Sequence, residues 1–217
     1  DGMLVLAYQY LAQCNPSYLK QILDLANDTF VGITDGQQFD MDFETRNDVS
    51  ELEYLEMIRL KTSILLAACL KMGAILGGAS EEDANLLYSF GEKLGLAFQL
   101  QDDLLDVYGD VKVFGKRIGG DIVCNKKTYM YINTCLLASD EERAILAKWA
   151  QYEGDDVDAK IEAVKGVYDS VGIKGKAEAK IEELFNEAMS LLNKVSVLEE
   201  KKSVLREYAL SLMNRVL

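Results

Sequence analysis

The sequence predicts an all-α protein. The chain of 217 residues contains one proline, Pro16, and proline is excluded from helix interiors. Apolar residues recur at helical spacing along most of the chain, and no segment shows the alternation that is typical of strands. Apolar side chains make up 49% of the residues, which is enough for a packed core. We therefore expect a single all-α domain over residues 1–217.

The expected helices follow from periodicity and from end signals. A short apolar helix over residues 3–12 ends before Pro16, and a long helix follows over 17–43. Ser50 and Glu53 form a capping box for the next helix. Acidic residues open the helix after it, at the positive end of its dipole. In order, the remaining segments are a helix over 51–76, a helix over 80–108, an irregular glycine-rich stretch over 109–125, and helices over 126–137, 140–152, 157–171, 174–195 and 198–216.

The longest apolar run, residues 62–80, is interrupted by Lys71. A lysine in the middle of a membrane span costs ~3 kcal/mol, so we expect a buried helix here and no integral membrane segment. Cys69 lies in this run and is expected to be a small core residue. The four cysteines form no C-x-x-C pair, and isolated free cysteines are typical of a cytoplasmic protein.

Charge and residue types exclude several function classes. Thirty-six acidic residues against 23 basic ones give a net charge of −13, whereas a nucleic-acid-binding protein needs a basic surface. The chain contains no histidine. A Ser-His-Asp triad, a His-ligated zinc site and a histidine general base are therefore excluded within this sequence.

An acidic cluster lies inside the apolar helix expected over residues 80–108. At 100° per residue, Asp102 and Asp106 lie about 40° apart on one helical face, with Asp103 beside them. Like charges at this spacing weaken a helix by ~0.2–0.5 kcal/mol, and apolar neighbours raise the desolvation cost. A divalent cation relieves both costs, and oxygen ligands without His or Cys favour Mg²⁺ or Mn²⁺. The alternative is a solvated acidic face.

Basic residues follow this acidic cluster at once. Over residues 111–127 five basic residues and one acid, Asp121, give a local charge of +4: Lys112, Lys116, Arg117, Lys126 and Lys127. A basic loop beside an acidic metal face suits a diphosphate–metal complex, because Mg²⁺ bridges carboxylate and phosphate oxygens while lysines neutralise the remaining charge. The glycines indicate that the loop orders when the anion binds. The alternative is a solvated turn.

Lys61 shares a helical stripe with Tyr54 and apolar residues, so its ammonium group is expected to point into the bundle. A buried ammonium group needs an anion. That anion is either a ligand or a structural partner such as Glu56 or Asp40. Gln37 and Asp40 lie three residues apart on the preceding helix and are expected to line the same cavity.

Four segments occur in the order typical of one known family. GLAFQLQDDLLDVYGD (residues 95–110) followed by GKRIGGDIVCNKKT (115–128) resembles the second aspartate-rich motif and the following lid of the polyprenyl synthetases. GQQFDMD (36–42) and RLKTSILL (59–66) match two further motifs of this family. The resemblance covers the whole chain. It implies the all-α isoprenoid-synthase bundle of the trans-isoprenyl diphosphate synthases.

The resemblance implies a metal site on the acidic cluster. Asp102, Asp103 and Asp106 resemble the second-motif Mg²⁺ ligands, with Asp102 the main one; Mn²⁺ is the other candidate ion. Gln37 and Asp40 belong to another matched motif and are expected among the substrate-binding residues.

The resemblance also implies where the substrates bind. Lys61, Lys116 and Lys126 match the lysines that hold the allylic diphosphate, and Asp121 matches a lid residue that orients the basic loop. These assignments predict a catalytic role for Lys61 and Lys116, because positive charge on the leaving diphosphate assists its departure.

Three further positions are implied around the reacting carbons. Thr62 and Gln99 match residues beside the reacting carbons and, like Asp102, are expected to be catalytic. Phe98 matches a residue of the homoallylic pocket. In this family isopentenyl diphosphate is condensed with an allylic diphosphate by ionisation, alkene attack and proton loss. A reaction of this kind needs no histidine base.

One motif of the family has no counterpart here. The first aspartate-rich motif precedes the segment that residues 1–4 resemble, so the chain is expected to be a C-terminal portion whose N-terminal helices are missing. We expect this portion to be inactive alone, and the product chain length cannot be read from it. A homodimer is the expected assembly.

The resulting function hypothesis is a Mg²⁺-dependent trans-prenyltransferase of isoprenoid biosynthesis. The alternatives are a class I terpene cyclase and a non-catalytic regulatory subunit of a prenyltransferase. The paired lysines of the basic loop and the motifs around Gln37 and Lys61 favour elongation over cyclisation. The retained acidic cluster, which is costly for folding, argues against a regulatory subunit.

Overall fold

The prediction of an all-α protein is confirmed. The computed structural model describes residues 2–109 and 118–213, and within these ranges it contains helices and no strand. In chain order the elements are α1 (Gly2–Leu11), α2 (Pro16–Thr45), α3 (Glu51–Ile58), the π-helical segment η1 (Arg59–Ser63), α4 (Ile64–Leu76), α5 (Glu81–Tyr108), α7 (Gly120–Val123), α8 (Tyr129–Leu137), α9 (Asp140–Ala150), α10 (Val157–Ser170), α11 (Ile173–Lys194) and α12 (Glu199–Met213).

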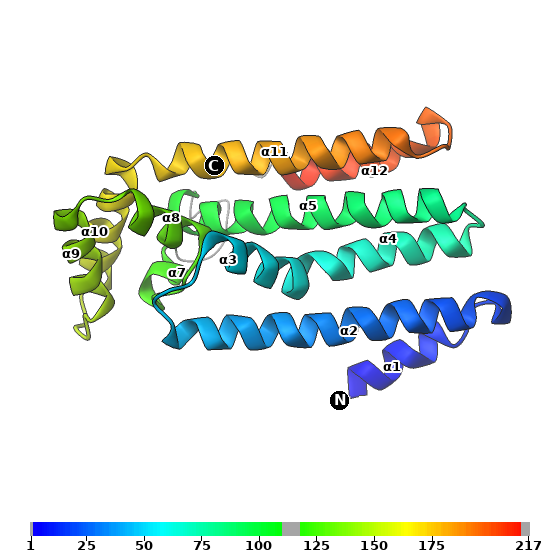
Figure 1. Cartoon of the computed structure of the whole chain (residues 1–217), viewed down its shortest axis with the longest axis horizontal. Helices are drawn as coiled ribbons and strands as arrows, with labels where there is room; N and C mark the ends of the chain where they lie inside the picture. Colours follow the sequence, from blue (N-terminus) through cyan, green and yellow to red (C-terminus); the bar gives the residue numbers. More distant parts are fainter. Residues whose placement is uncertain (1, 110–117, 214–217) are drawn as a thin grey trace.

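The long helices α2, α4, α5 and α11 lie side by side, while α9 and α10 lie together at one end of the bundle (Figure 1). Helix α5 is central, because it packs against α4 on one side and α11 on the other. Short connections join α2 to α3 and α4 to α5, and short connections place consecutive helices antiparallel. The central position of α5 buries the helix that carries the acidic cluster.

The helix ends follow the signals in the sequence. The side chain of Asn15 accepts a hydrogen bond from the backbone N–H of Ser17 at the start of α2. The predicted capping box is present at the start of α3, where Ser50 and Glu53 bond to each other's backbone N–H groups. These bonds satisfy N–H groups that have no partner within the helix.

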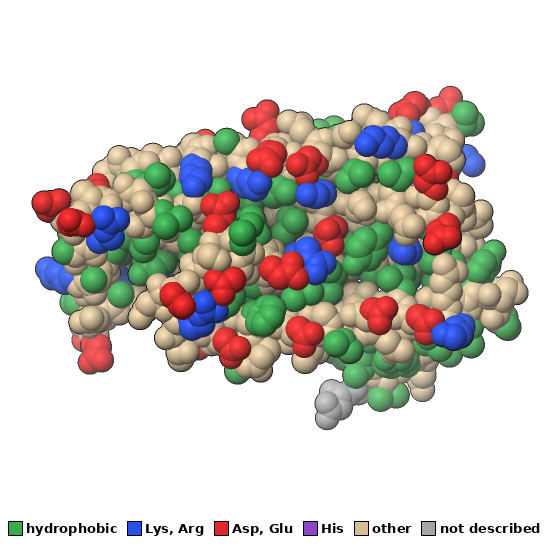
Figure 2. All heavy atoms as spheres, in the orientation of Figure 1, with side chains coloured by type: hydrophobic (Ala, Val, Ile, Leu, Met, Phe, Trp, Pro, Cys, Tyr) green, Lys and Arg blue, Asp and Glu red, His purple; other side chains and the backbone are tan. Residues whose placement is uncertain are grey.

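The largest core cluster lies where α3, α5, α8, α10 and α11 meet. Leu100 and Leu104 of α5 are 1% and 2% exposed and pack into this cluster. By contrast, α1 buries no residue, and the apolar side chains of Met3, Leu4 and Val5 are exposed. Figure 2 shows hydrophobic side chains on the surface of this end of the molecule. The core is therefore concentrated around the end of α5 that carries the aspartates.

The structure corrects two expectations about residues 51–80. The helix predicted over 51–76 is interrupted by η1, where the N–H of Ile64 bonds to the carbonyl of Arg59, five residues back. The expectation that Cys69 is a core residue is wrong, because Cys69 is exposed together with Leu65 and Leu76. Among the described residues α4 packs mainly on α2 and α5, and its side that carries Leu65, Cys69 and Leu76 is exposed. None of the described helices is long and apolar enough to span a bilayer.

The stretch predicted to be irregular, residues 109–125, contains the short helix α7. Gly119, at φ 84°, precedes it, and Asn125, at φ 54°, follows it. Both have the left-handed conformation, which is most accessible to glycine and asparagine. The basic residues Lys112, Lys116 and Arg117 lie outside the described residues.

Candidate active site

The segment η1 is held between two glycines. A Cβ atom placed on Gly36 of α2 would lie 2.5 Å from the backbone nitrogen of Lys61, and one on Gly95 of α5 would lie 2.7 Å from the Cα atom of Ser63. Neither contact leaves room for a side chain. Such π-helical segments often occur at functional sites, and this one carries Lys61 and Thr62. The close approach of α2 and α5 therefore fixes the position of both residues.

Replacing Gly36 by alanine is expected to destabilise the protein by about 1–3 kcal/mol, because the added methyl group meets backbone atoms that cannot rotate away. The matched control is Gly166→Ala in α10, where a Cβ atom has no neighbour within 4 Å and alanine should stabilise the helix by ~1 kcal/mol. Urea unfolding of both variants measures the difference. Equal stability of the two variants would show that α2 can move away from η1 without cost.

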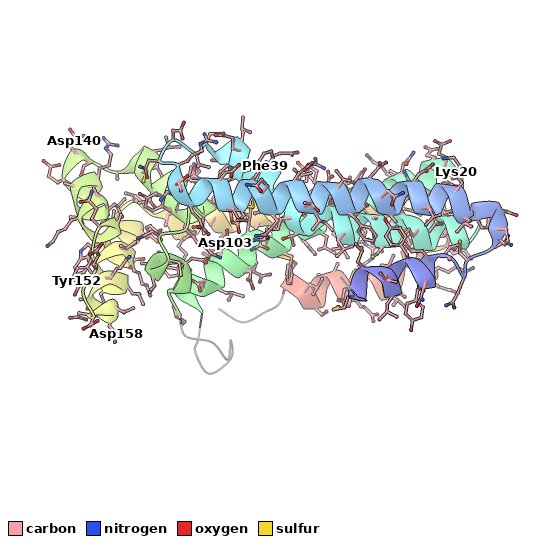
Figure 3. The ribbon with its side chains drawn as sticks, turned by 90° about the horizontal axis from the view of Figure 1, so that it is seen from below. Lys20, Phe39, Asp103, Asp140, Tyr152 and Asp158 are labelled. Atoms are coloured by element: carbon pink, nitrogen blue, oxygen red, sulfur yellow. The ribbon has the colours of Figure 1, made fainter. Side chains whose placement is uncertain are left out.

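A cleft of about 690 Å³, its open mouth included, lies between η1, α2 and α5. Most of the described residues that the sequence pointed to line it, together with Glu44 and Lys127: Asp40, Lys61, Thr62, Gln99, Asp102, Asp103, Asp121 and Lys126. Figure 3 labels Phe39 on α2 and Asp103 on α5, two of the helices that border the cleft. Segments distant in the sequence thus meet at one site.

Lys61 pairs with Asp40 across the cleft. The Nζ atom of Lys61 lies 2.6 Å from Oδ2 of Asp40, and the two side chains are 34% and 25% exposed. The structural partner considered for this lysine is therefore present, and it lies in the cleft wall. Because both side chains are partly open to solvent, the pair leaves the ammonium group accessible to an anion in the cleft.

A chain of hydrogen bonds connects the buried side chains of Tyr54 and Asp103 to Thr62 in the wall of the cleft. The buried hydroxyl of Tyr54 donates to Oδ2 of Asp103, and Nε2 of Gln99 donates to Oδ1 of the same carboxylate over 3.2 Å. The hydroxyl of Thr62 donates to Oε1 of Gln99 over 3.1 Å. Burial raises the pKa of Asp103 to about 7, against the opposing effect of the Tyr54 hydrogen bond. Burial also raises the pKa of Tyr54 far above its ordinary value.

Asp106 and Asp121 connect α5 to the short helix α7. The backbone N–H of Asp121 donates to Oδ2 of Asp106 over 2.9 Å, and the carboxylate of Asp121 lies 3.2 Å from Nζ of Lys126. Burial raises the pKa of Asp106, and the N–H bond from Asp121 opposes this. Asp106 thus holds α7 in place, and Asp121 directs Lys126 toward the cleft.

A buried lysine fixes the chain between α7 and Lys126. Lys160 of α10 is 5% exposed, and its Nζ atom donates to the carbonyl of Val123 over 3.1 Å and to Oδ1 of Asn125 over 2.8 Å. Burial lowers the pKa of this lysine. The periodicity of α10 marks position 160 as inward-facing, but its partner could not be inferred from the sequence.

The structure does not place every predicted residue in the cleft. Gln37 is exposed on α2 and is absent from the lining of the cleft, as is Phe98 of α5. Lys116 lies outside the described residues. Tyr54 was not predicted to be a site residue. Its place on the Lys61 stripe, seven residues earlier, is the signal that could have identified it.

The cleft wall suits an oxygen-binding cation that is shared with a ligand. Among residues 2–109 and 118–213 no three acidic or cysteine side chains converge at metal-binding distance. Mg²⁺ is commonly held by one or two carboxylates, with waters and substrate phosphates completing its octahedron. Asp102 is half-buried and lines the cleft, where its carboxylate supplies oxygen atoms of the kind that Mg²⁺ prefers. The donor set fits Mg²⁺ bound through Asp102 together with an anion.

Sequence comparison identifies relatives over part of this chain. The family model described as polyprenyl synthetase matches residues 1–167. A geranylgeranyl diphosphate synthase of Methanosarcina mazei is 42% identical over 135 residues, which cover 61% of this chain and 42% of that protein. The chain thus spans less than half the length of this curated relative.

Solved structures of similar proteins cover almost the whole chain. A crystal structure of a geranylgeranyl pyrophosphate synthase superposes with a TM-score of 0.92 at 38% identity, covering 100% of this chain and 67% of that one. A Corynebacterium glutamicum geranylgeranyl pyrophosphate synthase, solved with isoprenyl diphosphate and magnesium, gives a TM-score of 0.89 at 26% identity, covering 98% and 60%. The family match, the helical bundle and the motifs around its cleft agree: the chain belongs to the polyprenyl synthetase family.

Proposed function

We propose that the protein carrying this chain is a prenyltransferase that condenses isopentenyl diphosphate with an allylic diphosphate. The observation that supports this most directly is the meeting of Lys61, Lys126 and Asp102 in one cleft with the hydroxyl of Thr62 and the amide of Gln99. The relatives named as geranylgeranyl diphosphate synthases carry out chemistry of this class. Isoprenoid biosynthesis is the corresponding process.

The charges of the cleft explain how it would hold a diphosphate. Five carboxylates and three lysines are among its described lining residues. These described residues alone therefore repel a diphosphate unless cations join it. Mg²⁺ bound through Asp102, or Mn²⁺ with the same preference for oxygen, would supply that positive charge and neutralise the leaving diphosphate. Lys61 and Lys126 hold the remaining phosphate oxygens as point charges.

The reaction begins when the allylic C–O bond breaks and the electron pair leaves with the diphosphate. Thr62 and Gln99 present oxygen atoms beside the electron-deficient carbon. The alkene of isopentenyl diphosphate then attacks this carbon, a new C–C bond forms, and the resulting cation loses a proton to the released diphosphate. The buried apolar side chains of Met57 and Ile58 in the cleft wall limit the water around the cation.

We further propose that the protein is cytoplasmic and forms a homodimer. All four cysteines are free, as expected in a reducing compartment: Cys14, Cys69, Cys124 and Cys135. The exposed apolar side chains of α1 and α4 provide surface that a second chain can cover.

Incubation of the full-length protein with isopentenyl diphosphate, an allylic diphosphate and Mg²⁺ tests the proposal. We expect a product longer by one or more five-carbon units, together with released diphosphate. Mass analysis distinguishes this outcome from cyclisation, which consumes no isopentenyl diphosphate. Absence of elongated product with every allylic substrate offered would refute the proposed function.

A further inference from the structure

Tyr54 is a fully buried tyrosine whose hydroxyl points at a carboxylate of the site. It lies on α3, is 3% exposed, and donates its hydrogen bond to Oδ2 of Asp103. Asp103 itself is 4% exposed, so solvent reaches little of its carboxylate. In a buried environment such a bond is stronger than in water, and an unpaired hydroxyl or carboxylate would be costly. Each group therefore fixes the other.

The carboxylate of Asp103 determines which way the Gln99 amide faces. Gln99 lies four residues earlier on α5, and both oxygens of the Asp103 carboxylate accept hydrogen bonds in the structure, Oδ2 from Tyr54 and Oδ1 from Gln99. Gln99 must therefore turn its NH₂ group toward Oδ1 of Asp103, at 3.2 Å, and its carbonyl oxygen away from it. The carbonyl oxygen faces Thr62 in the wall of the cleft.

The amide in turn determines the direction of the Thr62 hydroxyl. Thr62 has one hydroxyl proton, and the oxygen of Gln99 accepts it over 3.1 Å. The lone pairs of the Thr62 oxygen are then left for the cleft. The reversed amide would present an NH₂ group to Thr62, and the hydroxyl proton would turn into the cleft instead. That arrangement would place positive hydrogen atoms beside the ligand.

We propose that Tyr54 and Asp103 are positioning residues that act through the Gln99 amide and keep oxygen lone pairs of Gln99 and Thr62 directed at an electron-deficient carbon in the cleft. This inference rests on the proposed prenyltransferase function. It assigns Asp103 to orientation of the site rather than to metal binding. It also gives a role to Tyr54, whose hydroxyl donates its hydrogen bond to Asp103.

Tyr54, Asp103, Gln99 and Thr62 form a hydrogen-bonded relay whose members come from different helices. Tyr54 comes from α3, Thr62 from η1, and Gln99 and Asp103 from successive turns of α5. The π-helical segment, held between Gly36 and Gly95, sets the position of Thr62 opposite Gln99. The relay therefore spans three elements and ends in the cleft.

The test uses Tyr54→Phe and Asp103→Asn in the full-length protein, with Tyr168→Phe as the matched control. Tyr54→Phe removes one oxygen atom, and we expect kcat to fall about tenfold. Asp103→Asn replaces an acceptor oxygen with a donor group, so the Gln99 amide can turn over, and we expect kcat to fall by ~10². Tyr168 is an equally buried tyrosine of the α10 core, and its variant should retain wild-type kcat.

Substrate and metal binding separate this role from the alternatives. For both variants of the relay we expect KM values within about twofold of wild type, because Tyr54 and Asp103 are 3% and 4% exposed and are bonded to each other. Calorimetry of inorganic diphosphate with Mg²⁺ should give unchanged affinity. Thermal unfolding of each variant is measured in parallel. If Tyr54→Phe lowers Tm, the kcat of Asp103→Asn is used to test the proposal, because asparagine has nearly the same shape as aspartate.

Two results would overturn the proposal. Wild-type kcat in both variants would show that the amide needs no fixed orientation. Weaker Mg²⁺-dependent diphosphate binding by Asp103→Asn would show that Asp103 is a metal ligand. A wild-type protein that elongates no substrate would refute the proposed function, and the relay with it. Failure of the relay alone would leave wild-type elongation intact, so the two failures are distinguishable.

Discussion

Replacement of Asp102 by alanine is expected to lower kcat by ~10²–10³, the loss typical for a group that stabilises charge in the transition state. Asp102 is half-buried and lines the cleft beside Thr62 and Gln99, where a bound cation would meet the leaving diphosphate. Folding should be unaffected or slightly improved. The charge of Asp102 is among those that raise the pKa of Asp103, and its removal relieves that repulsion.

Steady-state kinetics and urea unfolding of Asp102→Ala measure the two halves of this prediction. Asp28→Ala, an exposed carboxylate on α2 away from the cleft, is the control and should leave kcat unchanged. An Asp102→Ala variant that keeps kcat within a few-fold of wild type would show that the cation is held elsewhere. A large loss of stability would show instead that the carboxylate is structural.

Removal of divalent cations is expected to abolish binding of inorganic diphosphate. Among the described lining residues of the cleft, five carboxylates outnumber three lysines, and Lys61 is already paired with Asp40. Without a cation these residues repel a diphosphate, whereas Mg²⁺ held by Asp102 would neutralise part of its charge. We expect weak but measurable affinity in Mg²⁺ and none in EDTA.

Calorimetry on residues 1–217, with and without Mg²⁺, makes this measurement. Lys126→Ala is a useful comparison, since it should weaken binding in Mg²⁺ without removing the need for the cation. Equal affinity in EDTA would show that the carboxylates of α5 carry no metal for this ligand. We also expect residues 1–217 alone to elongate no substrate, and measurable elongation would show that the essential metal ligands all lie in this portion.

The helical fold was predictable because its signals are local. Proline content, the helical spacing of apolar residues and the Ser50–Glu53 capping box all depend on residues within a few turns of one another. The structure confirms the helices and the capping box that these signals predict. The spacing of Asp102, Asp103 and Asp106 on one helix is local in the same sense. The order of four motifs added the family, which the family-model match over residues 1–167 supports.

Other features depend on contacts between distant segments. Cys69 lies in an apolar run, yet it is exposed, because the described helices that pack on α4, mainly α2 and α5, do not cover the side that carries it. The periodicity of the sequence also does not predict the π-helical segment at Arg59–Ser63. Its close contacts with Gly36 and Gly95 come from two other helices.

The sequence by itself therefore determined the fold class, the family and the residue types of the site, because these follow from periodicity, composition and motif order. Only the tertiary structure decided how the three aspartates differ. Asp102 lines the cleft, Asp103 is enclosed by Tyr54 and Gln99, and Asp106 accepts the N–H of Asp121. The physical reason is that burial and hydrogen bonding are set by whatever packs against each carboxylate, and those neighbours lie up to 49 residues away along the chain.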